Sequence, residues 1–392
     1  MTQISFARGL LAATAISSFV VAGHASAQES EGVAGAAPAS TGENVIIVTA
    51  TKSGQSLEDT AAAISVLGAD DVGAGGIEDA GDLAAAVPNV SVGDQFGVNR
   101  TFIRGIGLTS IDLGADGAVA FLQNGAINSR PAAQLSGFYD IAQIEVLRGP
   151  QGTTYGRGAT GGVINIVTAR PTPYFEGYAR ATYGNYDVVT LEGAVGGPIA
   201  GDVLAFRVAG KYESRDGFGE NLVTGNPVDD RDAYAFRGSL QANLTPDLEV
   251  LVVADHFRED DYNYGFHYFG PTVVPEAALP GPLLGGDTIN DYYADLGQPV
   301  DNRNLYSNED AINDRKGTSV QGIVTFDRGD FSLTSTTAYR TFERFNRNDL
   351  DVSDANAFGQ NNYVEDSESF SQELTFTADL GTISLLGGAM YF

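Results

Sequence analysis

Apolar and polar residues alternate with a period of two along much of the chain that follows Pro171. Between residues 234 and 241, one face of the pattern holds Tyr234, Phe236 and Leu240, and the other holds Arg237, Ser239 and Gln241. The same pattern occurs near residues 206–212 and 370–380. Successive side chains of a β-strand point to opposite faces, so this alternation predicts strands with one apolar and one polar face.

The spacing of these strands indicates which kind of β-protein they form. Nine strands are predicted, near residues 175–183, 186–196, 203–212, 233–243, 248–258, 318–327, 331–341, 370–379 and 383–392. Apart from the tight turn at Gly184-Asn185, short and long connections alternate along the chain. Outer-membrane barrels have short periplasmic turns and long outer loops, whereas a soluble β-sandwich has no reason to follow that rule. The connections therefore favour an antiparallel transmembrane β-barrel over a soluble sandwich.

The region between Lys52 and Pro171 mixes short helices with short strands. Residues 81–87 predict a helix that Pro88 ends, and residues 101–104 and 118–122 predict strands. A length of about 120 residues is ordinary for one compact domain. The predicted fold class is therefore an α+β domain over residues 52–171, followed by a barrel domain over residues 172–392.

Residues 143–170 have the order strand, glycine-rich turn, strand. Residues 156–161 match the spacing G-x-G-x-x-G, which in dinucleotide-binding proteins opens a helix. Here the strand-like run Val163–Val167 follows, so a dinucleotide site is excluded.

Composition excludes several classes of function. The formal net charge of -28 disfavours nucleic acid and anionic membrane as partners. The chain has no cysteine and no H-E-x-x-H pattern, and no nucleophile and base form a recognisable motif. We therefore expect no enzymatic activity, no cofactor and no metal site.

The N-terminus has the organisation of a secretory signal peptide over residues 1–27. Arg8 supplies the positive charge, the apolar run Leu10–Ala22 is too short to span a bilayer, and Ala25-Ser26-Ala27 has the form of a cleavage site. Residues 28–44 are small, polar and aperiodic, which predicts a flexible leader. A secreted chain without cysteine fits a bacterial envelope protein.

Several segments carry the motifs of a known family. They are Val45–Thr51, Thr60–Leu67, Asp82–Val90, Arg100–Gly107, Gln143–Thr168, Ser371–Leu374 and Leu386–Phe392. With these motifs the chain resembles a TonB-dependent outer-membrane receptor, of the sphingomonad and caulobacter branch. The first segment resembles the TonB box, with residues Val45, Ile46, Ile47, Val48, Thr49, Ala50 and Thr51. The middle segments resemble the plug domain, and the last two resemble barrel strands.

The resemblance implies a plug domain inside a barrel of about 22 strands in the bacterial outer membrane, in contact with its lipid. An external ligand binds at the plug apices and outer loops, and the inner-membrane TonB protein then captures the box by β-strand addition and pulls on it. The resemblance also implies tight turns with positive φ at the glycines of the closing motif. These are Gly149, Gly152, Gly156, Gly158, Gly161 and Gly162.

The resemblance further implies a reversible lock between plug and barrel. Charged plug residues are expected to pair with groups of the barrel wall, because buried guanidinium groups rarely go unpaired. The predicted lock residues are Arg104, Glu145, Arg148 and Arg157.

The favoured ligand is a ferric siderophore, which is common in the family. An aromatic outer segment suits stacking on a sugar or an aromatic siderophore. Its candidate residues are Tyr262, Tyr264, Phe266, His267 and Tyr268. Oligosaccharide, haem and cobalamin remain open as ligands, and a passive porin or a surface adhesin remains open as another class.

Nine strands are too few for the barrel that the resemblance implies. An odd number of strands cannot close an antiparallel barrel of this bacterial type, and an open edge in lipid costs several kcal/mol for each unpaired group. We therefore expect the sequence to be a fragment that lacks roughly half to two thirds of its barrel, against the about 22 strands of the family.

Overall fold

The computed structural model describes residues 47–52, 54–110, 114–115, 117–156, 158–267, 303–350 and 360–392. The predicted signal peptide, residues 1–27, and the predicted leader, residues 28–44, lie outside the described residues. So do Val45, Ile46, Arg157 and Tyr268. Within the described part of the chain, the helices are all too short or too polar to cross a membrane.

The N-terminal domain is built on a mixed five-stranded sheet with the order β3-β9-β10-β7-β8. Its strands are β3 (Ile64–Gly68), β7 (Val119–Gln123), β8 (Ala126–Ile127), β9 (Ile141–Arg148) and β10 (Gly162–Thr168). β10 pairs with β9 antiparallel and with β7 parallel. Val163 belongs to one hydrophobic cluster and Ile164 to another, so β10 is buried on both faces. This explains why its sequence is rich in β-branched residues.

Smaller elements complete the domain. They are β1 (Ile47–Val48), β2 (Gln55–Ser56), α1 (Ala69–Gly75), α2 (Leu83–Ala86), β4 (Val90–Gln95), β5 (Val98–Ile103), β6 (Ile106–Gly107), the 3-10 helix η1 (Pro131–Leu135) and α3 (Gly152–Tyr155). The helix predicted over residues 81–87 is α2, which ends before Pro88. The sequence did not predict α1, nor the single turn α3 that lies within the glycine-rich connection between β9 and β10.

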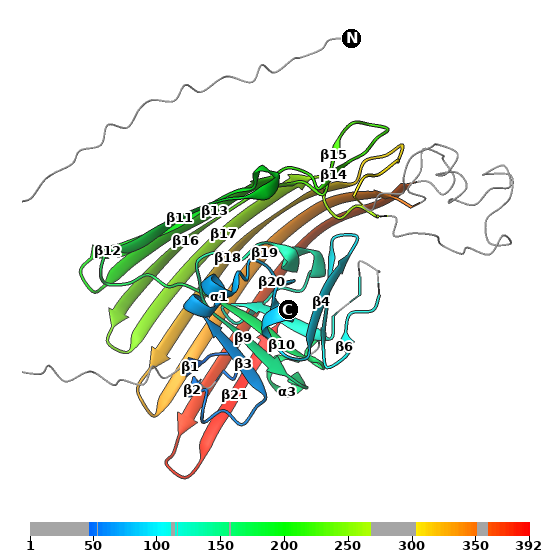
Figure 1. Cartoon of the computed structure of the whole chain (residues 1–392). Helices are drawn as coiled ribbons and strands as arrows, with labels where there is room; N and C mark the ends of the chain where they lie inside the picture. The colour runs from blue at the N-terminus through cyan, green and yellow to red at the C-terminus, as the bar shows by residue number, and fades with distance from the viewer. Residues whose placement is uncertain are drawn as a thin grey trace, which may run out of the picture. The chain divides into compact units, whose positions relative to one another are not determined.

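The rest of the chain forms one antiparallel sheet of nine strands, which confirms the predicted number and order. The strands are β11 (Glu176–Tyr183), β12 (Val189–Ala200), β13 (Leu204–Arg215), β16 (Arg231–Thr245), β17 (Leu248–Asp261), β18 (Ile312–Asp327), β19 (Phe331–Asp349), β20 (Gln360–Asp379) and β21 (Ser384–Tyr391). Figure 1 shows these strands side by side in chain order, from green β11 to red β21. The 3-10 helix η2 (Asn185–Asp187) lies in the turn after β11, and β14 (Gly219–Glu220) and β15 (Pro227–Val228) form a small hairpin.

Three strands extend further than the sequence predicted. β18 begins at Ile312, β19 continues to Asp349, and β20 begins at Gln360. In this part of β19 the outward positions include the charged residues Glu343 and Arg347, so the apolar face that marks a strand is missing there. The predicted strands were therefore too short, because alternation of apolar and polar residues marks only the part of a strand that faces an apolar environment.

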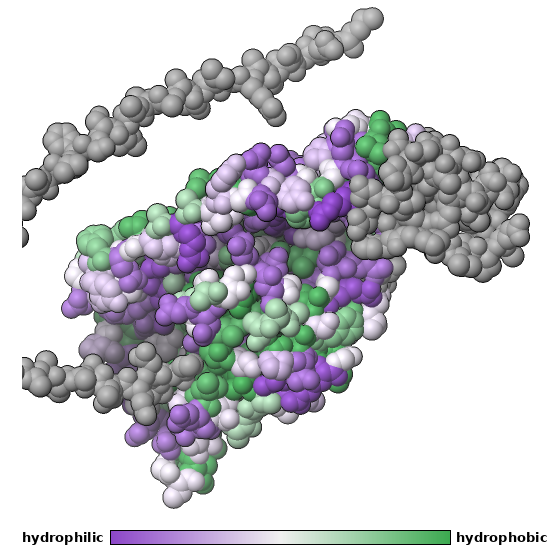
Figure 2. All heavy atoms as spheres, in the orientation of Figure 1, coloured by the Kyte–Doolittle hydropathy of each residue, from purple (hydrophilic) through white to green (hydrophobic). Residues whose placement is uncertain are grey.

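The two faces of the sheet have opposite character, as the alternation predicted. Val208 is 51% exposed and Phe236 is 52% exposed, whereas the neighbouring Arg207 and Arg237 are 7% and 5% exposed. Polar side chains thus face the interior and apolar ones the exterior, the reverse of a soluble fold. Figure 2 shows hydrophobic residues gathered near the middle of one view, where Figure 1 draws elements of the N-terminal domain, with hydrophilic residues around them.

One glycine of the β9–β10 pair leaves no room for a side chain. Gly162 has φ +157, and a Cβ atom there would lie 2.3 Å from the carbonyl oxygen of Leu147. We expect Gly162→Ala to lower the free energy of unfolding by roughly 3 kcal/mol, through overpacking and backbone strain. Gly152→Ala is the matched control, since a Cβ there would meet nothing within 4 Å. Urea unfolding of both variants would measure the difference, and equal stability would contradict the packing argument.

Candidate functional site

The first described residues of the chain are bound to the N-terminal domain through one buried carboxylate. Glu145 is on β9 and is 0% exposed. The backbone N–H of Thr49 donates to its Oε1 at 2.7 Å, and the backbone N–H of Ala50 donates to its Oε2 at 2.6 Å. The Thr49 hydroxyl donates to Oε1 at 2.9 Å, and the side-chain amide of Asn165 on β10 donates to Oε2 at 3.0 Å. Bonds to a charged acceptor are stronger than neutral ones, so this carboxylate is a firm anchor.

α3 supplies a second contact to the same segment. The Tyr155 hydroxyl donates to the carbonyl oxygen of Ala50 at 2.6 Å. Burial raises the pKa of Tyr155, and the nearby Glu145 and Glu373 carboxylates raise it further, so the hydroxyl stays protonated and available as a donor. Lys52 lies 4.3 Å from the centre of the Tyr155 ring, donates to the carbonyl oxygen of Thr154 at 3.0 Å and pairs with Glu373 of β20.

The segment expected to be free for another protein is therefore largely covered. Ile47–Val48 forms β1 and pairs antiparallel with β2 of the same domain. Val48 and Ala50 are 0% and 1% exposed and pack in one hydrophobic cluster with Leu147. An extended run of small and β-branched residues pairs as well with its own domain as with a foreign sheet edge, which the sequence pattern alone does not distinguish.

A buried ion pair joins the N-terminal domain to the sheet. Asp140 immediately precedes β9 and faces Arg207 of β13. Arg207 Nε donates to one carboxylate oxygen at 2.8 Å and Nη2 donates to the other at 2.5 Å. Arg207 Nη1 donates to Glu176 of β11 at 2.9 Å. This two-pronged geometry is the one that favours arginine over lysine at such a site.

Four other side chains of the sheet hold backbone carbonyl groups of the N-terminal domain. Arg237 donates to the carbonyls of Tyr139 and Asp140, Arg315 to those of Ala132 and Leu135, Arg344 to those of Phe96 and Gly97, and Gln321 to those of Gln123 and Asn124. The distances lie between 2.9 Å (Arg344 to Phe96) and 3.5 Å (Arg315 to Leu135). Each of these side chains thus binds two carbonyl groups at once.

The predicted lock residues are placed differently from the expectation. Arg104 is exposed, at φ 53, and its backbone N–H donates to the carbonyl of Asn89 at 2.9 Å. Arg148 donates to the carbonyl of Pro88 at 3.4 Å. Glu145 binds the N-terminal segment, and Arg157 is outside the described residues. A plug arginine does meet a barrel carboxylate at Arg130, which lies 3.6 Å from Glu365 of β20 and was not among the predicted residues. At the Asp140–Arg207 pair the arrangement is the reverse, because the arginine belongs to the sheet.

The glycines of the closing motif fulfil their expected role in part. Gly149, Gly156, Gly158 and Gly162 have positive φ. Gly152 and Gly161 are absent from that group, which corrects the expectation for these two. Gly152 opens α3, and Gly161 lies so close to its neighbours that a Cβ would be 2.8 Å from the carbonyl oxygen of Ile106.

The aromatic residues predicted to bind a ligand lie partly against the N-terminal domain. The rings of Phe266 and Phe96 meet edge to face at 4.8 Å. The Tyr264 hydroxyl accepts from Arg315 at 2.7 Å, and burial raises the pKa of Tyr264 to about 12. His267 lies 2.5 Å from Asp229, and the backbone N–H of Tyr262 donates to Asp230 at 2.6 Å. Most of these side chains are thus already in contact with other residues of the protein. Tyr268 lies outside the described residues.

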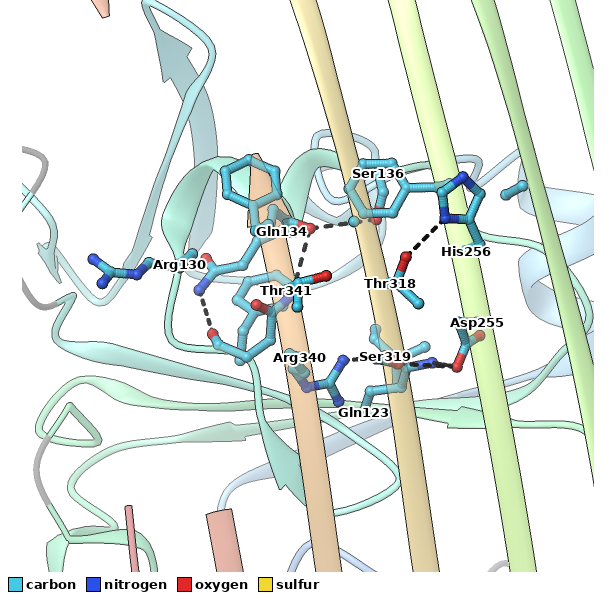
Figure 3. Close-up of a pocket in the computed structure, with 18 of the residues that line it drawn as sticks. Gln123, Arg130, Gln134, Ser136, Asp255, His256, Thr318, Ser319, Arg340 and Thr341 are labelled. Carbon is cyan, nitrogen blue, oxygen red and sulfur yellow. Dashed lines mark hydrogen bonds between the residues drawn. The ribbon is translucent and has the colours of Figure 1, made fainter. Parts of the chain in front are cut away.

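A cavity of about 120 Å³ lies where the N-terminal domain meets β16–β20. Figure 3 shows Gln123 of the N-terminal domain beside Asp255, Ser319 and Arg340 of the sheet. Ser129, Arg130 and Gln134, in and just before η1, line its other side. None of these residues was among those predicted from the sequence.

Comparison with known families finds one domain model that matches. Residues 56–163 match the TonB-dependent Receptor Plug Domain. The pesticin receptor of Yersinia pestis is 28% identical over 206 residues, which is 52% of this chain and 30% of that protein. The ferric enterobactin receptor PirA of Pseudomonas aeruginosa is 28% identical over 254 residues, or 57% of this chain and 33% of that protein. The matched part of the chain thus spans about a third of the length of these curated relatives.

Solved structures resemble a larger part of the chain. The ferric yersiniabactin uptake receptor of Yersinia pestis superposes with a TM-score of 0.69 at 19% identity, and covers 83% of this chain and 47% of that one. The siderophore receptor PiuA of Acinetobacter baumannii gives 0.66 at 16% identity, with 86% and 46% covered. Likeness at this level of identity concerns the fold, and it includes both the N-terminal domain and the nine-stranded sheet.

Proposed function

Because this chain is a TonB-dependent receptor, with the plug domain and part of the β-barrel of that family, we propose that it takes up a scarce ligand actively across the outer membrane. The N-terminal domain is the plug, and the nine-stranded sheet is the part of the barrel wall present here. Members of this family are not enzymes, and the outer membrane is their location.

The observation that carries the proposal is the attachment of residues 47–52 to the plug. The segment is bound through Glu145, Asn165 and Tyr155. A force that pulls on the segment would act directly on these hydrogen bonds. We propose that Val45–Thr51 is the TonB box and that TonB captures it by strand addition. Release of the segment from Glu145 would then couple capture to movement of the plug.

We propose a ferric siderophore as the ligand. The relatives named as receptors for ferric enterobactin and ferric yersiniabactin support this class. The half-buried rings of Phe266 and Tyr363, which pack on the buried Phe96, would offer aromatic surface to such a ligand. Growth of a deletion strain on single iron, cobalamin, haem or glycan sources tests the ligand, and a growth defect confined to a source other than iron would overturn the siderophore proposal.

Deletion of residues 45–51 should abolish energised uptake and leave ligand binding intact. The deletion removes the strand that TonB would pair with, whereas the outer surface of the receptor is unchanged. Radiolabelled ferric siderophore uptake and binding at low temperature measure the two properties separately. Deletion of residues 29–35, of equal length within the predicted leader, is the control. Uptake that survives the first deletion would contradict the box assignment, as would the absence of any cross-link from Ile47→Cys to TonB.

A further inference from the structure

One row of side chains crosses five strands of the barrel wall and faces the plug. Register pairs join Arg237 of β16 to Asp255, Asp255 to Ser319, Ser319 to Arg340, and Arg340 to Ser369 of β20. All five residues line the 120 Å³ cavity. Figure 3 shows Asp255, Ser319 and Arg340 of this row next to Gln123 of the plug.

The carboxylate of the row, Asp255, already accepts several hydrogen bonds. Asp255 accepts from Arg237 Nε at 2.6 Å, from the Gln123 amide at 3.2 Å and from the Ser319 hydroxyl at 3.3 Å. Arg237 therefore has its counter-ion, and Arg130 at the other side of the cavity has Glu365 at 3.6 Å. Arg340 is the arginine of the cavity lining without a carboxylate partner among the described residues.

The free atoms of Arg340 form one edge of its guanidinium group. Nη1 donates to Gln123 Oε1 at 3.1 Å, whereas Nε and Nη2 are buried and have no hydrogen-bond partner among the residues that the structure describes. Nε–H and one N–H of Nη2 point in the same direction, and this pair is the fork that binds carboxylate and phosphate oxygens two at a time. A buried guanidinium cannot lose its proton to avoid the cost of burial, so an acceptor for this edge is strongly favoured.

We propose that Arg340, with Ser369 beside it, binds a small free oxyanion, a phosphate or a carboxylate, in the cavity between plug and wall. Because Arg130 pairs with Glu365 and Arg237 with Asp255, Arg340 leaves one uncompensated positive charge in the lining, which an anion would neutralise. The cavity of about 120 Å³ far exceeds the roughly 10–15 Å³ needed to hold one water molecule. The anion bridges the wall to the plug, because Arg340 also holds Gln123.

Equilibrium dialysis of the purified full chain with radiolabelled inorganic phosphate tests the site, with acetate as competitor. We expect saturable binding that Arg340→Gln weakens at least about tenfold, and that Arg340→Lys also weakens because lysine lacks the fork. Arg328→Gln is the matched control, since Arg328 lies in an exposed turn with 70% of its side chain accessible. Phosphate should also raise the unfolding temperature of the unmodified chain and of Arg328→Gln, but not that of Arg340→Gln.

Two results would overturn the site. One is the absence of saturable phosphate or acetate binding to the unmodified chain, and the other is equal binding to Arg340→Gln. The unfolding temperature without phosphate shows whether each variant is folded, and Arg340→Lys, which keeps the charge, provides a second folded variant. The assay contains neither TonB nor a transported ligand, so its outcome is independent of the proposed uptake function.

Discussion

Replacing Glu145 with alanine is expected to free the segment proposed as the TonB box from the plug. The variant loses the acceptor for the backbone N–H groups of Thr49 and Ala50 and for the Thr49 hydroxyl. Hydrogen bonds to a charged group contribute about 1.5–3 kcal/mol each, and they are not additive, so we expect local opening to become easier by about 3 kcal/mol. That corresponds to a rise of roughly a hundredfold in the open fraction.

A single engineered thiol measures this opening, because the chain has no cysteine of its own. Ala50→Cys places the thiol at a buried position, so its rate of maleimide labelling reports exposure of the segment. We expect slow labelling with Glu145 present and labelling faster by roughly a hundredfold with Glu145→Ala. Glu145→Gln should fall between them, since its amide keeps one acceptor oxygen. Ile47→Cys, at a position that is 44% exposed, should label quickly in every background.

Labelling of Ala50→Cys at one rate in all three backgrounds would refute the anchoring role of Glu145. A second measurement is cross-linking to TonB in intact bacteria. If the anchor restrains TonB capture, Glu145→Ala should cross-link to TonB from Ile47→Cys without ligand, whereas the unaltered receptor should need ligand. Cross-linking that stays ligand-dependent would show that another contact, such as that of Tyr155 with Ala50, controls release.

Breaking the Asp140–Arg207 pair should have the largest effect on stability. Arg207→Ala leaves Asp140 buried without its ion-pair partner, which costs about 3–5 kcal/mol. Asp140→Ala should cost less, because Arg207 keeps its bond to Glu176. The double variant should cost clearly less than the sum of the two, because it leaves neither charge stranded. Urea unfolding in detergent or lipid of the unmodified protein and these three variants measures the coupling between plug and wall.

An exposed pair provides the comparison for this cycle. Arg258 and Asp260 lie 2.9 Å apart, with side chains 37% and 62% exposed. Double-mutant coupling there should be below about 1 kcal/mol. Equal coupling in the two cycles would mean that the Asp140–Arg207 pair is not the buried link between plug and barrel that its geometry indicates.

The sequence predicted the barrel strands because a lipid-facing strand must alternate. Val208 and Phe236 face outward and Arg207 and Arg237 inward, and each is where the period of two placed it. The prediction ended where that constraint ends, at the polar outer parts of β18–β20. α2 was predictable from its stop at Pro88, whereas α1 and α3 are one or two turns long and carry too few residues for a periodic signal.

Several residues of the candidate site could be predicted from the sequence, but the contacts between them could not. The box segment and Glu145 were both selected from the sequence, but their hydrogen bonds join residues 96 positions apart, which no local pattern records. The lock was assigned to plug arginines because a buried guanidinium needs a partner. The same argument applies to Arg207, Arg237 and Arg315, which lie inward on strands. Their alternation with apolar residues was visible, and it could have identified them.

Four side chains of the barrel wall bind main-chain oxygens of the plug. Each of them donates to two carbonyl groups that lie close together in the plug sequence. These side chains are Arg237, Arg315, Arg344 and Gln321. A carbonyl oxygen is the same for every amino acid, so the side chains at these loop positions are free to drift over evolution. The number of residues in each loop is constrained, because one inserted residue would move both carbonyl oxygens away from the side chain that binds them. Plugs that keep Asp140 and equal loop lengths should therefore be exchangeable within one barrel even where the other loop side chains differ.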